Sequence, residues 1–201
     1  MIQTIRSVLA LPHAYQFFHY VIGAPSRSRV LVRDYIKPNP GDKILEIGCG
    51  PGAILPYLPD AEYTGFDVSA SYIRYAQKRF PRAKFVCERV SGYTLPHRDY
   101  FDIVLALAIL HHLDDAEALQ LFRTAYDALR PGGKLVTMDG VWTDDQSRAA
   151  RCVLARDRGQ FVRTQPEYLR LASQVFSHVR SNVRHGLLRI PYTHVMLECV
   201  R

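Results

Sequence analysis

The stretch ILEIGCGPGAIL, residues 44–55, constrains the fold more than any other part of this 201-residue chain. An aliphatic run typical of a buried strand leads through an acid, Glu46, to a loop in which every second residue is glycine. These glycines are Gly48, Gly50 and Gly52. Glycine tolerates left-handed backbone angles and lets another molecule approach the main chain closely. The pattern therefore predicts a strand followed by a loop that wraps around a ligand.

Short aliphatic runs alternate with amphipathic stretches along the rest of the chain. This alternation predicts an α/β fold, a doubly wound sheet of mostly parallel strands with helices on both faces. The run at 99–110 is so continuously apolar that both faces of its strand must be buried. The expected strands are 43–49, 61–68, 83–90, 99–110, 134–141, 181–186 and 193–200.

Helices are expected between these strands. Ser69 is placed to cap a helix that runs through Phe80, and Asp114 with Glu117 has the spacing of a capping box. The second of these helices should stop at Pro131-Gly132-Gly133. Residues 142–165 are polar and rich in arginine, and we expect them to be partly helical. The other expected helices are 26–37 and 166–176.

Composition sets the broad class of the protein. The length and a hydrophobic content of 48% suit a single domain, residues 1–201. The four cysteines show no metal-ligand spacing and no disulfide framework, which favours reduced thiols and a cytoplasmic location. Polar residues interrupt the apolar N-terminus, so we expect neither a signal peptide nor a membrane span there.

An acid one strand further along narrows the choice of ligand. Asp67 ends the second expected strand, where its carboxylate can accept hydrogen bonds from both hydroxyls of a ribose. This arrangement fits a dinucleotide or S-adenosylmethionine. Dinucleotide loops require a third glycine three positions after the second, but position 53 is Ala53. The G-x-G-x-G spacing therefore favours S-adenosylmethionine.

Four motifs in register carry a resemblance to a known family. EIGCGPG, FDVS, LPHRDYFDIVLALAILHHL and LRPGGKLV resemble, in order and spacing, the motifs of class I S-adenosylmethionine-dependent methyltransferases of the small, type 11/12-like kind. The resemblance implies a Rossmann-like seven-stranded sheet of order 3-2-1-4-5-7-6 with the last strand antiparallel. It implies S-adenosyl-L-methionine as cofactor and S-adenosyl-L-homocysteine as product.

The same resemblance assigns residues to the cofactor. Glu46 and the loop backbone would border its methionine end, Asp67 would hold the ribose, and the end of the third strand would contact the adenine. Ser91 stands where the family commonly has an acid, so its hydroxyl or the amide of Gly92 would make that contact. An N-terminal lid helix, residues 1–25, would close over the cofactor. The full set is Glu46, Gly48, Cys49, Gly50, Gly52, Asp67, Val68, Ser91, Gly92, Ala106 and Tyr15.

Candidate catalytic residues come from strand ends and from the lid. A hydroxyl or protonated amine needs a base during methyl transfer, and His111 is the first candidate and His19 the second. Asp139 ends the fifth strand and could bind substrate or simply cap the next helix. No metal site is indicated. A small cap, residues 142–165, would cover the acceptor side.

The acceptor is defined mainly by elimination. The chain has no Pro-Cys dipeptide, no Asn/Asp-Pro-Pro-aromatic stretch after the fourth strand and no paired-glutamate loop. A small molecule with a hydroxyl or amine remains, such as a sugar, a lipid- or carrier-linked intermediate or a secondary metabolite. Two alternatives stay open: an RNA methyltransferase that uses the arginine-rich C-terminal third, and a non-catalytic cofactor-binding relative. The arginines are scattered, which favours a solvated basic surface over a nucleic acid site.

Overall fold

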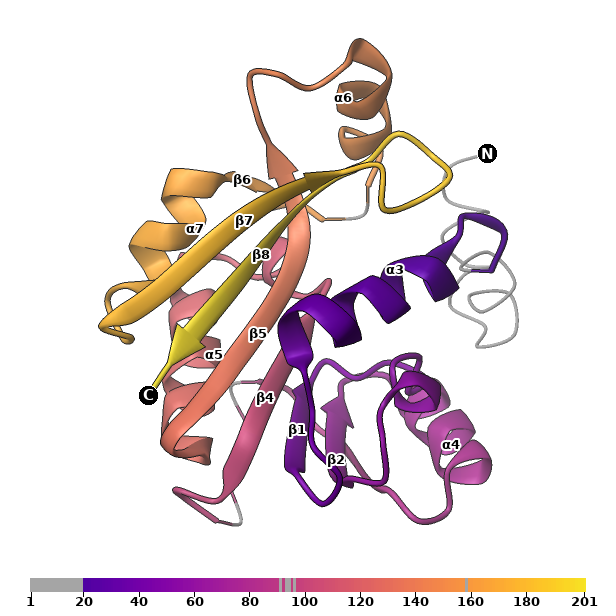
Figure 1. Ribbon diagram of the computed structural model, residues 1–201, viewed down its shortest axis with the longest axis vertical. Helices are drawn as coiled ribbons and strands as arrows, with labels where there is room; N and C mark the ends of the chain where they lie inside the picture. Colours follow the sequence, from indigo (N-terminus) through magenta and orange to yellow (C-terminus); the bar gives the residue numbers. More distant parts are fainter. Residues whose placement is uncertain (1–19, 91, 93–94, 96, 158) are drawn as a thin grey trace.

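A computed structural model describes residues 20–90, 92, 95, 97–157 and 159–201 (Figure 1). Its centre is a mixed sheet of eight strands, with the order β3-β2-β1-β4-β5-β8-β7 and with β6 paired to β5. The strands are β1 (Lys43–Ile47), β2 (Glu62–Asp67), β3 (Lys84–Cys87), β4 (Phe101–Leu107), β5 (Leu129–Trp142), β6 (Arg163–Thr164), β7 (His178–His185) and β8 (Thr193–Val200).

The strand order confirms the expected topology. Without the two-residue strand β6, the order along the sheet is 3-2-1-4-5-7-6. Strands β1 to β5 pair in parallel, whereas β8 is antiparallel to both β5 and β7. The reversed strand is therefore the last one, as the resemblance implied.

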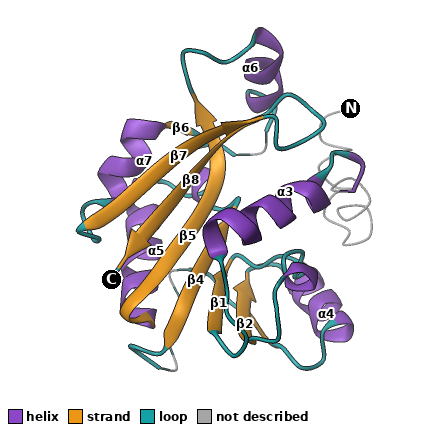
Figure 2. Ribbon diagram, viewed as in Figure 1, coloured by secondary structure: helices purple, strands orange, loops and turns teal. Residues whose placement is uncertain are grey.

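Helices cover both faces of this sheet. Figure 1 shows α3 and α4 on one side and α5 and α7 on the other, and Figure 2 shows the loops that join them to the strands. The helical elements are α3 (Ala24–Leu31), continued by a π-helical turn η1 (Val32–Ile36), η2 (Leu55–Tyr57), α4 (Ala70–Arg79), η3 (Leu110–His112), α5 (Asp115–Ala128), α6 (Arg148–Leu154) and α7 (Gln165–Ala172).

The two predicted helix caps are both present. The hydroxyl of Ser69 accepts the amide of Tyr72 at the start of α4. At the start of α5 the carboxylate of Asp114 accepts the amide of Glu117 at 2.9 Å, and the Glu117 side chain accepts the amide of Asp114 in return. These bonds satisfy amides that the first turn of a helix leaves without an intrahelical partner.

Alternating strand residues build one hydrophobic core on each face. Leu45 and Val104 face α5 and α7, whereas Ile44 and Ile103, their direct neighbours, face α3 and α4. Because successive side chains of a strand point to opposite faces, a strand apolar at every position must be covered on both sides. This explains why the continuous run in β4 lies at the centre of the sheet.

Several boundaries differ from the sequence expectation, among them the end of β3 at Cys87 instead of residue 90 and the start of β7 at His178 instead of residue 181. Strand β4 ends at Leu107 instead of residue 110, because Ala108 adopts a left-handed φ of 58° and starts a sharp turn into η3. The helix expected to stop at Pro131-Gly132-Gly133 ends at Ala128, and strand β5 starts at Leu129 instead of residue 134 and includes the Pro-Gly-Gly segment. Among the described residues no helix combines the length and apolar character that crossing a membrane requires.

Candidate active site

A cavity of about 990 Å³ opens at the carboxyl ends of β1, β2, β4 and β5. In an open α/β sheet this is the edge where the strand order reverses and where ligands bind. Two groups of residues line it. Gly48, Gly50 and Asp67 lie at one end, and a cluster around His111 and Asp139 contributes the remaining polar wall.

The glycine loop comes close to the turn that follows β4. Gly48 has a φ of 71°, and a Cβ added there would stand 2.4 Å from the Cδ1 atom of Ile109. Gly50 has a φ of 52°, but the nearest atom to an added Cβ is a ring carbon of Tyr72 at 4.0 Å. Position 48 therefore requires glycine, because a side chain would clash with Ile109 and the backbone is left-handed there. Gly50 has no side chain to cover its main chain, so the backbone there is open to the cavity.

Asp67 joins the loop to the second strand. One carboxylate oxygen accepts the amide of Gly50 at 2.9 Å, and the other accepts the amide of Ser69 at 2.7 Å. Burial raises the pKa of Asp67, and these two amides oppose that shift. Each carboxylate oxygen retains a further lone pair for a ligand hydroxyl. Beside it the exposed side chain of Val68 gives the cavity an apolar surface.

Glu46 lies behind the loop rather than on the main cavity wall. Together with Cys49 it lines a separate space of about 60 Å³. The hydroxyl of Tyr63 donates a hydrogen bond to the Glu46 carboxyl group. Burial raises the pKa of Glu46 to about 8, although the Tyr63 hydrogen bond works against this. Glu46 is thus a buried, protonated acid at neutral pH.

The polar cluster is built around His111, which the turn after β4 places beside β5. Its Nδ1 lies 2.8 Å from a carboxylate oxygen of Asp139, and its amide donates to the same oxygen at 3.2 Å. Its Nε2 lies 3.6 Å from a carboxylate oxygen of Asp157. The other oxygen of Asp157 accepts the hydroxyl of Tyr192 at 2.7 Å. The imidazole of His111 therefore lies between two carboxylates.

This arrangement favours the charged form of His111. Burial alone would lower the pKa of His111, but the hydrogen bond and charge of Asp139 and the charge of Asp157 raise it above its usual value. Burial would likewise raise the pKa of Asp157, yet the charge of His111 and the Tyr192 hydroxyl bring it below the usual value. Burial raises the pKa of Asp139, and the donations from His111 oppose that shift.

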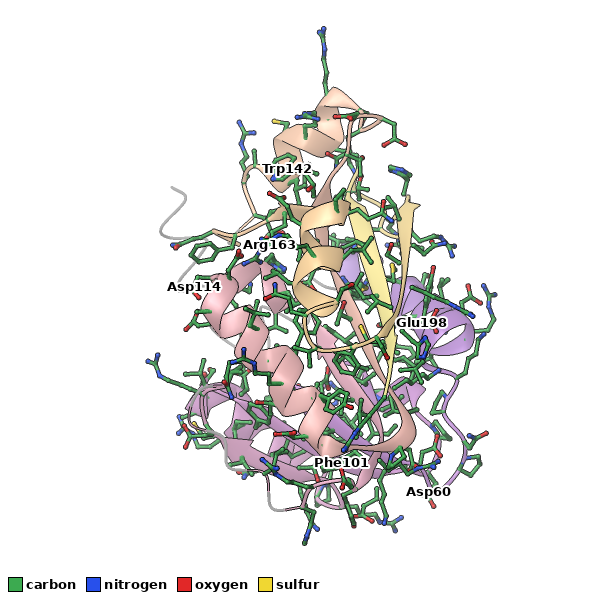
Figure 3. All side chains as sticks on the ribbon, turned by 90° about the vertical axis from the view of Figure 1, so that its left-hand side faces the viewer. Asp60, Phe101, Asp114, Trp142, Arg163 and Glu198 are labelled. Carbon is green, nitrogen blue, oxygen red and sulfur yellow. The ribbon has the colours of Figure 1, made fainter. Side chains whose placement is uncertain are left out.

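A buried arginine holds this turn in place. Arg163 donates to the carboxylate of Asp115 at 2.8 and 3.0 Å and to the backbone oxygens of Leu110 and Leu113. Figure 3 shows it beside the start of α5, close to the labelled Asp114. The amide of Phe161 also donates to the carbonyl of His111 at 2.9 Å. The segment after α6 is thereby fixed to the turn that carries His111.

The structure brings six of the predicted site residues to the large cavity and two further ones to the small one. Gly48, Gly50, Asp67, Val68, His111 and Asp139 line the large cavity. Glu46 and Cys49 line the small one.

Three predicted cofactor residues lie elsewhere. Ala106 is buried in the core, and its neighbours Leu107 and Ala108 reach the wall instead. Gly52 shapes the turn, where an added Cβ would stand 3.1 Å from the ring of Phe80. Gly92 is exposed and does not line the cavity. The predictions for Tyr15, His19 and Ser91 fall outside the described residues.

Sequence reasoning missed several wall residues. Glu88, Arg89 and Val90 follow β3 and line the cavity, so the acid at this strand end is Glu88 rather than a residue at position 91. Their place directly after the third strand was the available signal. Tyr192 and His194 come from the β7–β8 connection and β8, where no local motif marked them.

Residues 44–133 match the family described as methyltransferase domain. The 27-O-demethylrifamycin SV methyltransferase of Amycolatopsis mediterranei is 36% identical over 107 residues, which are 49% of this chain and 39% of that protein. The yeast tRNA (carboxymethyluridine(34)-5-O)-methyltransferase of Saccharomyces cerevisiae is 28% identical over 124 residues, 60% of this chain and 43% of that protein.

Residues 44–133 thus resemble a methyltransferase domain in sequence, and the sheet order is the one expected for class I S-adenosylmethionine-dependent methyltransferases. The chain spans less than half the length of those two relatives. The solved structure of phosphoethanolamine N-methyltransferase 2 from Haemonchus contortus, with phosphomonomethylethanolamine and S-adenosylhomocysteine, has the same fold. The TM-score is 0.69 at 18% identity, covering 88% of this chain and 52% of that one.

The cavity suits S-adenosylmethionine, the cofactor of the methyltransferases that this chain resembles. Asp67 offers carboxylate lone pairs for ribose hydroxyls, and Val68 with Val90 offers apolar surface for a base. The open main chain at Gly50 lets a ligand approach where any side chain would project into the cavity.

Proposed function

We propose that this chain transfers the methyl group of S-adenosylmethionine to a hydroxyl or amine of a small-molecule acceptor. The observation that supports this best is that two different sets of residues line one cavity of about 990 Å³. One set of its wall residues, around Asp67, suits an adenosyl group, and another, around His111, Asp139 and Asp157, is rich in titratable side chains. Such a cavity has room for a donor and an acceptor together.

S-adenosylmethionine supplies an activated methyl group, so the protein's task is to align the acceptor and exclude water. The wall of the domain supports both tasks. Ile22, Leu188 and Ile190 contribute apolar side chains, and Asp157 and Tyr192 are fixed to each other by a 2.7 Å hydrogen bond. Asp67 would hold the ribose at the opposite end.

The segment 142–165 supports the expected cap on the acceptor side. Val153, Arg156 and Asp157, from α6 and the turn after it, line the cavity. We propose that residues 1–201 form one domain with this small cap. We also propose a cytoplasmic location, because all four cysteines are free thiols. A carrier-linked acceptor remains compatible with this proposal.

RNA is the second candidate acceptor. It draws support from the likeness to a tRNA methyltransferase and from Arg180, which is exposed on the edge strand β7. Binding to RNA through phosphates should weaken steeply with salt. If the protein does not bind RNA even at low salt, this candidate is excluded.

The proposal is tested with methyl-tritiated S-adenosylmethionine. The full chain is incubated separately with hydroxylated aromatic compounds, with phosphoethanolamine and with total tRNA, and the tritium transferred to each acceptor is measured. We expect turnover with a small molecule and none with tRNA. Asp67→Ala should abolish turnover at low cofactor concentration. Cofactor binding without turnover on any acceptor would favour the non-catalytic alternative, whereas methylated tRNA would favour the second candidate.

A further inference from the structure

Two spaces share part of their wall at the glycine loop, the cavity of about 990 Å³ and the small one of about 60 Å³ behind the loop. Among the described residues six line both spaces, and one of the six carries a charge. They are Arg27, Gly48, Gly50, Leu107, Ala108 and Met138. Arg27 therefore brings a positive charge to the part of the wall where the loop leaves its main chain open.

The sequence of α3 directs Arg27 to this place. The buried residues of the helix are Ala24, Ser28 and Leu31, which recur at intervals of four and three and so share one face. Arg27 follows Ala24 by three positions and belongs to the same face. It is half-buried, whereas Arg29, two positions further on, is exposed. The period of the helix thus turns Arg27 towards the interior and Arg29 towards solvent.

Contacts at both ends of the helix fix the position of Arg27. Before α3, the amide of Arg189 donates to the carbonyl of Ile22 at 2.8 Å. After α3, in η1, the hydroxyl of Tyr35 donates to the side-chain oxygen of Asn182 at 3.1 Å. Both partners belong to β7 or to its connection to β8, which lies beside α3 (Figure 1). The helix that carries Arg27 is therefore tied to the sheet at two points.

The charge of Arg27 acts on the interior of the cavity. Burial lowers the pKa of His194 well below its usual value, and the charge of Arg27 contributes to the same shift. The acid that lines the small space is Glu46, and burial raises its pKa to about 8. Glu46 is therefore protonated at neutral pH and brings no negative charge to this end of the cavity. An anionic group of a ligand is favoured here.

S-adenosylmethionine, the cofactor of the methyltransferases that this chain resembles, carries one anionic group, the carboxylate of its methionine end. With the ribose at Asp67, this end would lie along the glycine loop. We propose that the guanidinium of Arg27 binds this carboxylate, and that Arg27 thereby selects adenosyl compounds that retain it. This rests on the proposed function and names a residue that determines cofactor specificity. An arginine can donate two parallel hydrogen bonds to a carboxylate, a geometry that a lysine lacks.

The inference separates two compounds that differ in this group alone. Decarboxylated S-adenosylmethionine keeps the adenosyl group, the sulfonium and the ammonium and lacks the carboxylate. Both of its charged groups are cations, which Arg27 repels. A third compound, 5′-methylthioadenosine, lacks the amine and the carboxylate together, so its binding depends on the Asp67 side of the cavity.

Calorimetry on the full chain gives the affinities for these three compounds. We expect the wild type to bind S-adenosylmethionine at least about tenfold more tightly than its decarboxylated form, and Arg27→Met to lose most of this preference. Arg27→Lys keeps the charge without the paired donors and should keep only part of it. The matched control is Arg29→Met on the same helix, which should keep all of it. Arg29 is exposed and lies over the ring of Tyr57, 5.8 Å from its centroid.

The affinity for 5′-methylthioadenosine shows whether a variant retains its fold, and Arg27→Met should bind this compound as the wild type does. An unchanged preference in such a variant would overturn the inference. An equal loss of affinity for all three compounds would also overturn it, because it would assign Arg27 to the fold. A wild type that binds S-adenosylmethionine and its decarboxylated form equally would overturn it without any variant. Failure of the wild type to bind any of the three would instead overturn the proposed function.

Discussion

Replacing Glu46 with glutamine tests the account of the acid buried behind the glycine loop. Glutamine has nearly the same shape, and its amide oxygen can still accept the hydroxyl of Tyr63. The carboxyl group of Glu46 has a pKa of about 8 in the folded chain, against 4.5 for an unperturbed glutamate. The unfolded chain therefore ionises at a lower pH than the folded chain.

The sign and size of the effect follow from this difference. Below pH 4.5 both states hold the proton, and Glu46 has its full stabilising effect. As the pH rises from 4.5 towards 8, the unfolded state loses the proton first, and the free energy of unfolding falls by about 1.4 kcal/mol per pH unit. The whole shift corresponds to about 5 kcal/mol, lost by the time the pH passes the folded pKa.

Urea unfolding at pH 5, 6.5 and 8, followed by the fluorescence of Trp142, measures this loss. Glu46→Gln should gain several kcal/mol relative to wild type between pH 5 and pH 8, because it has no proton to lose. Glu62→Gln is the matched control, since Glu62 also accepts a tyrosine hydroxyl, from Tyr100 at 2.9 Å, but is exposed. Its effect should stay within about 0.5 kcal/mol at each pH.

A constant difference between Glu46→Gln and wild type across this pH range would refute the reasoning. It would mean that Glu46 is ionised in the folded chain at neutral pH. The loop would then rest on a buried negative charge beside Asp67 rather than on a neutral acid.

Three further predictions concern the fold and the cofactor. Phe122→Ala removes a fully buried ring of α5 that packs edge-on against Phe176 and should cost about 3–5 kcal/mol in urea unfolding; a cost under 1 kcal/mol would contradict its place in the core. Asp114→Ala removes the capping box of α5 and should cost about 1 kcal/mol by the same assay, whereas no change would mean that the cap contributes nothing. Asp67→Ala should weaken S-adenosylhomocysteine binding at least about tenfold in calorimetry, because a charged acceptor of ribose hydrogen bonds is lost; unchanged affinity would remove Asp67 from the site.

Much of the architecture could be predicted from the sequence because its signals are local. The buried strands are continuous apolar runs, and Ser69 and Asp114 begin helices through bonds to residues three positions away. The strand order came from the resemblance, since four motifs in register specify a topology that periodicity alone does not. Asp67 and the glycine loop were identified earlier, from the spacing of the glycines after one strand and the acid at the end of the next.

The acceptor side could not be predicted because its contacts join distant positions. Tyr192 donates a hydrogen bond to Asp157, which is 35 residues away in the sequence. Arg163 donates to Asp115, which is 48 residues away. No spacing rule marks such pairs. His194 lies in an apolar strand, where a single histidine carries no pattern, and only the antiparallel pairing of β8 with β5 brings it to the cavity.

Boundaries differed where backbone conformation overrode side-chain pattern. The apolar run of β4 continues to Leu110, but the left-handed turn at Ala108 ends the strand three residues earlier. The amide of Ala108 donates to the carbonyl of Met138 at 2.7 Å, which ties this turn to β5. The turn directs His111 towards Asp139, so the departure from the predicted strand is what forms the polar cluster.

A crystal structure of the full chain grown with S-adenosylhomocysteine is the most direct test of the central claim. We predict that the ribose hydroxyls contact the carboxylate of Asp67 and that the homocysteine end lies against the main chain at Gly50. Density for the compound at another place on the surface, or a cavity that stays free of it at saturating concentration, would contradict the account.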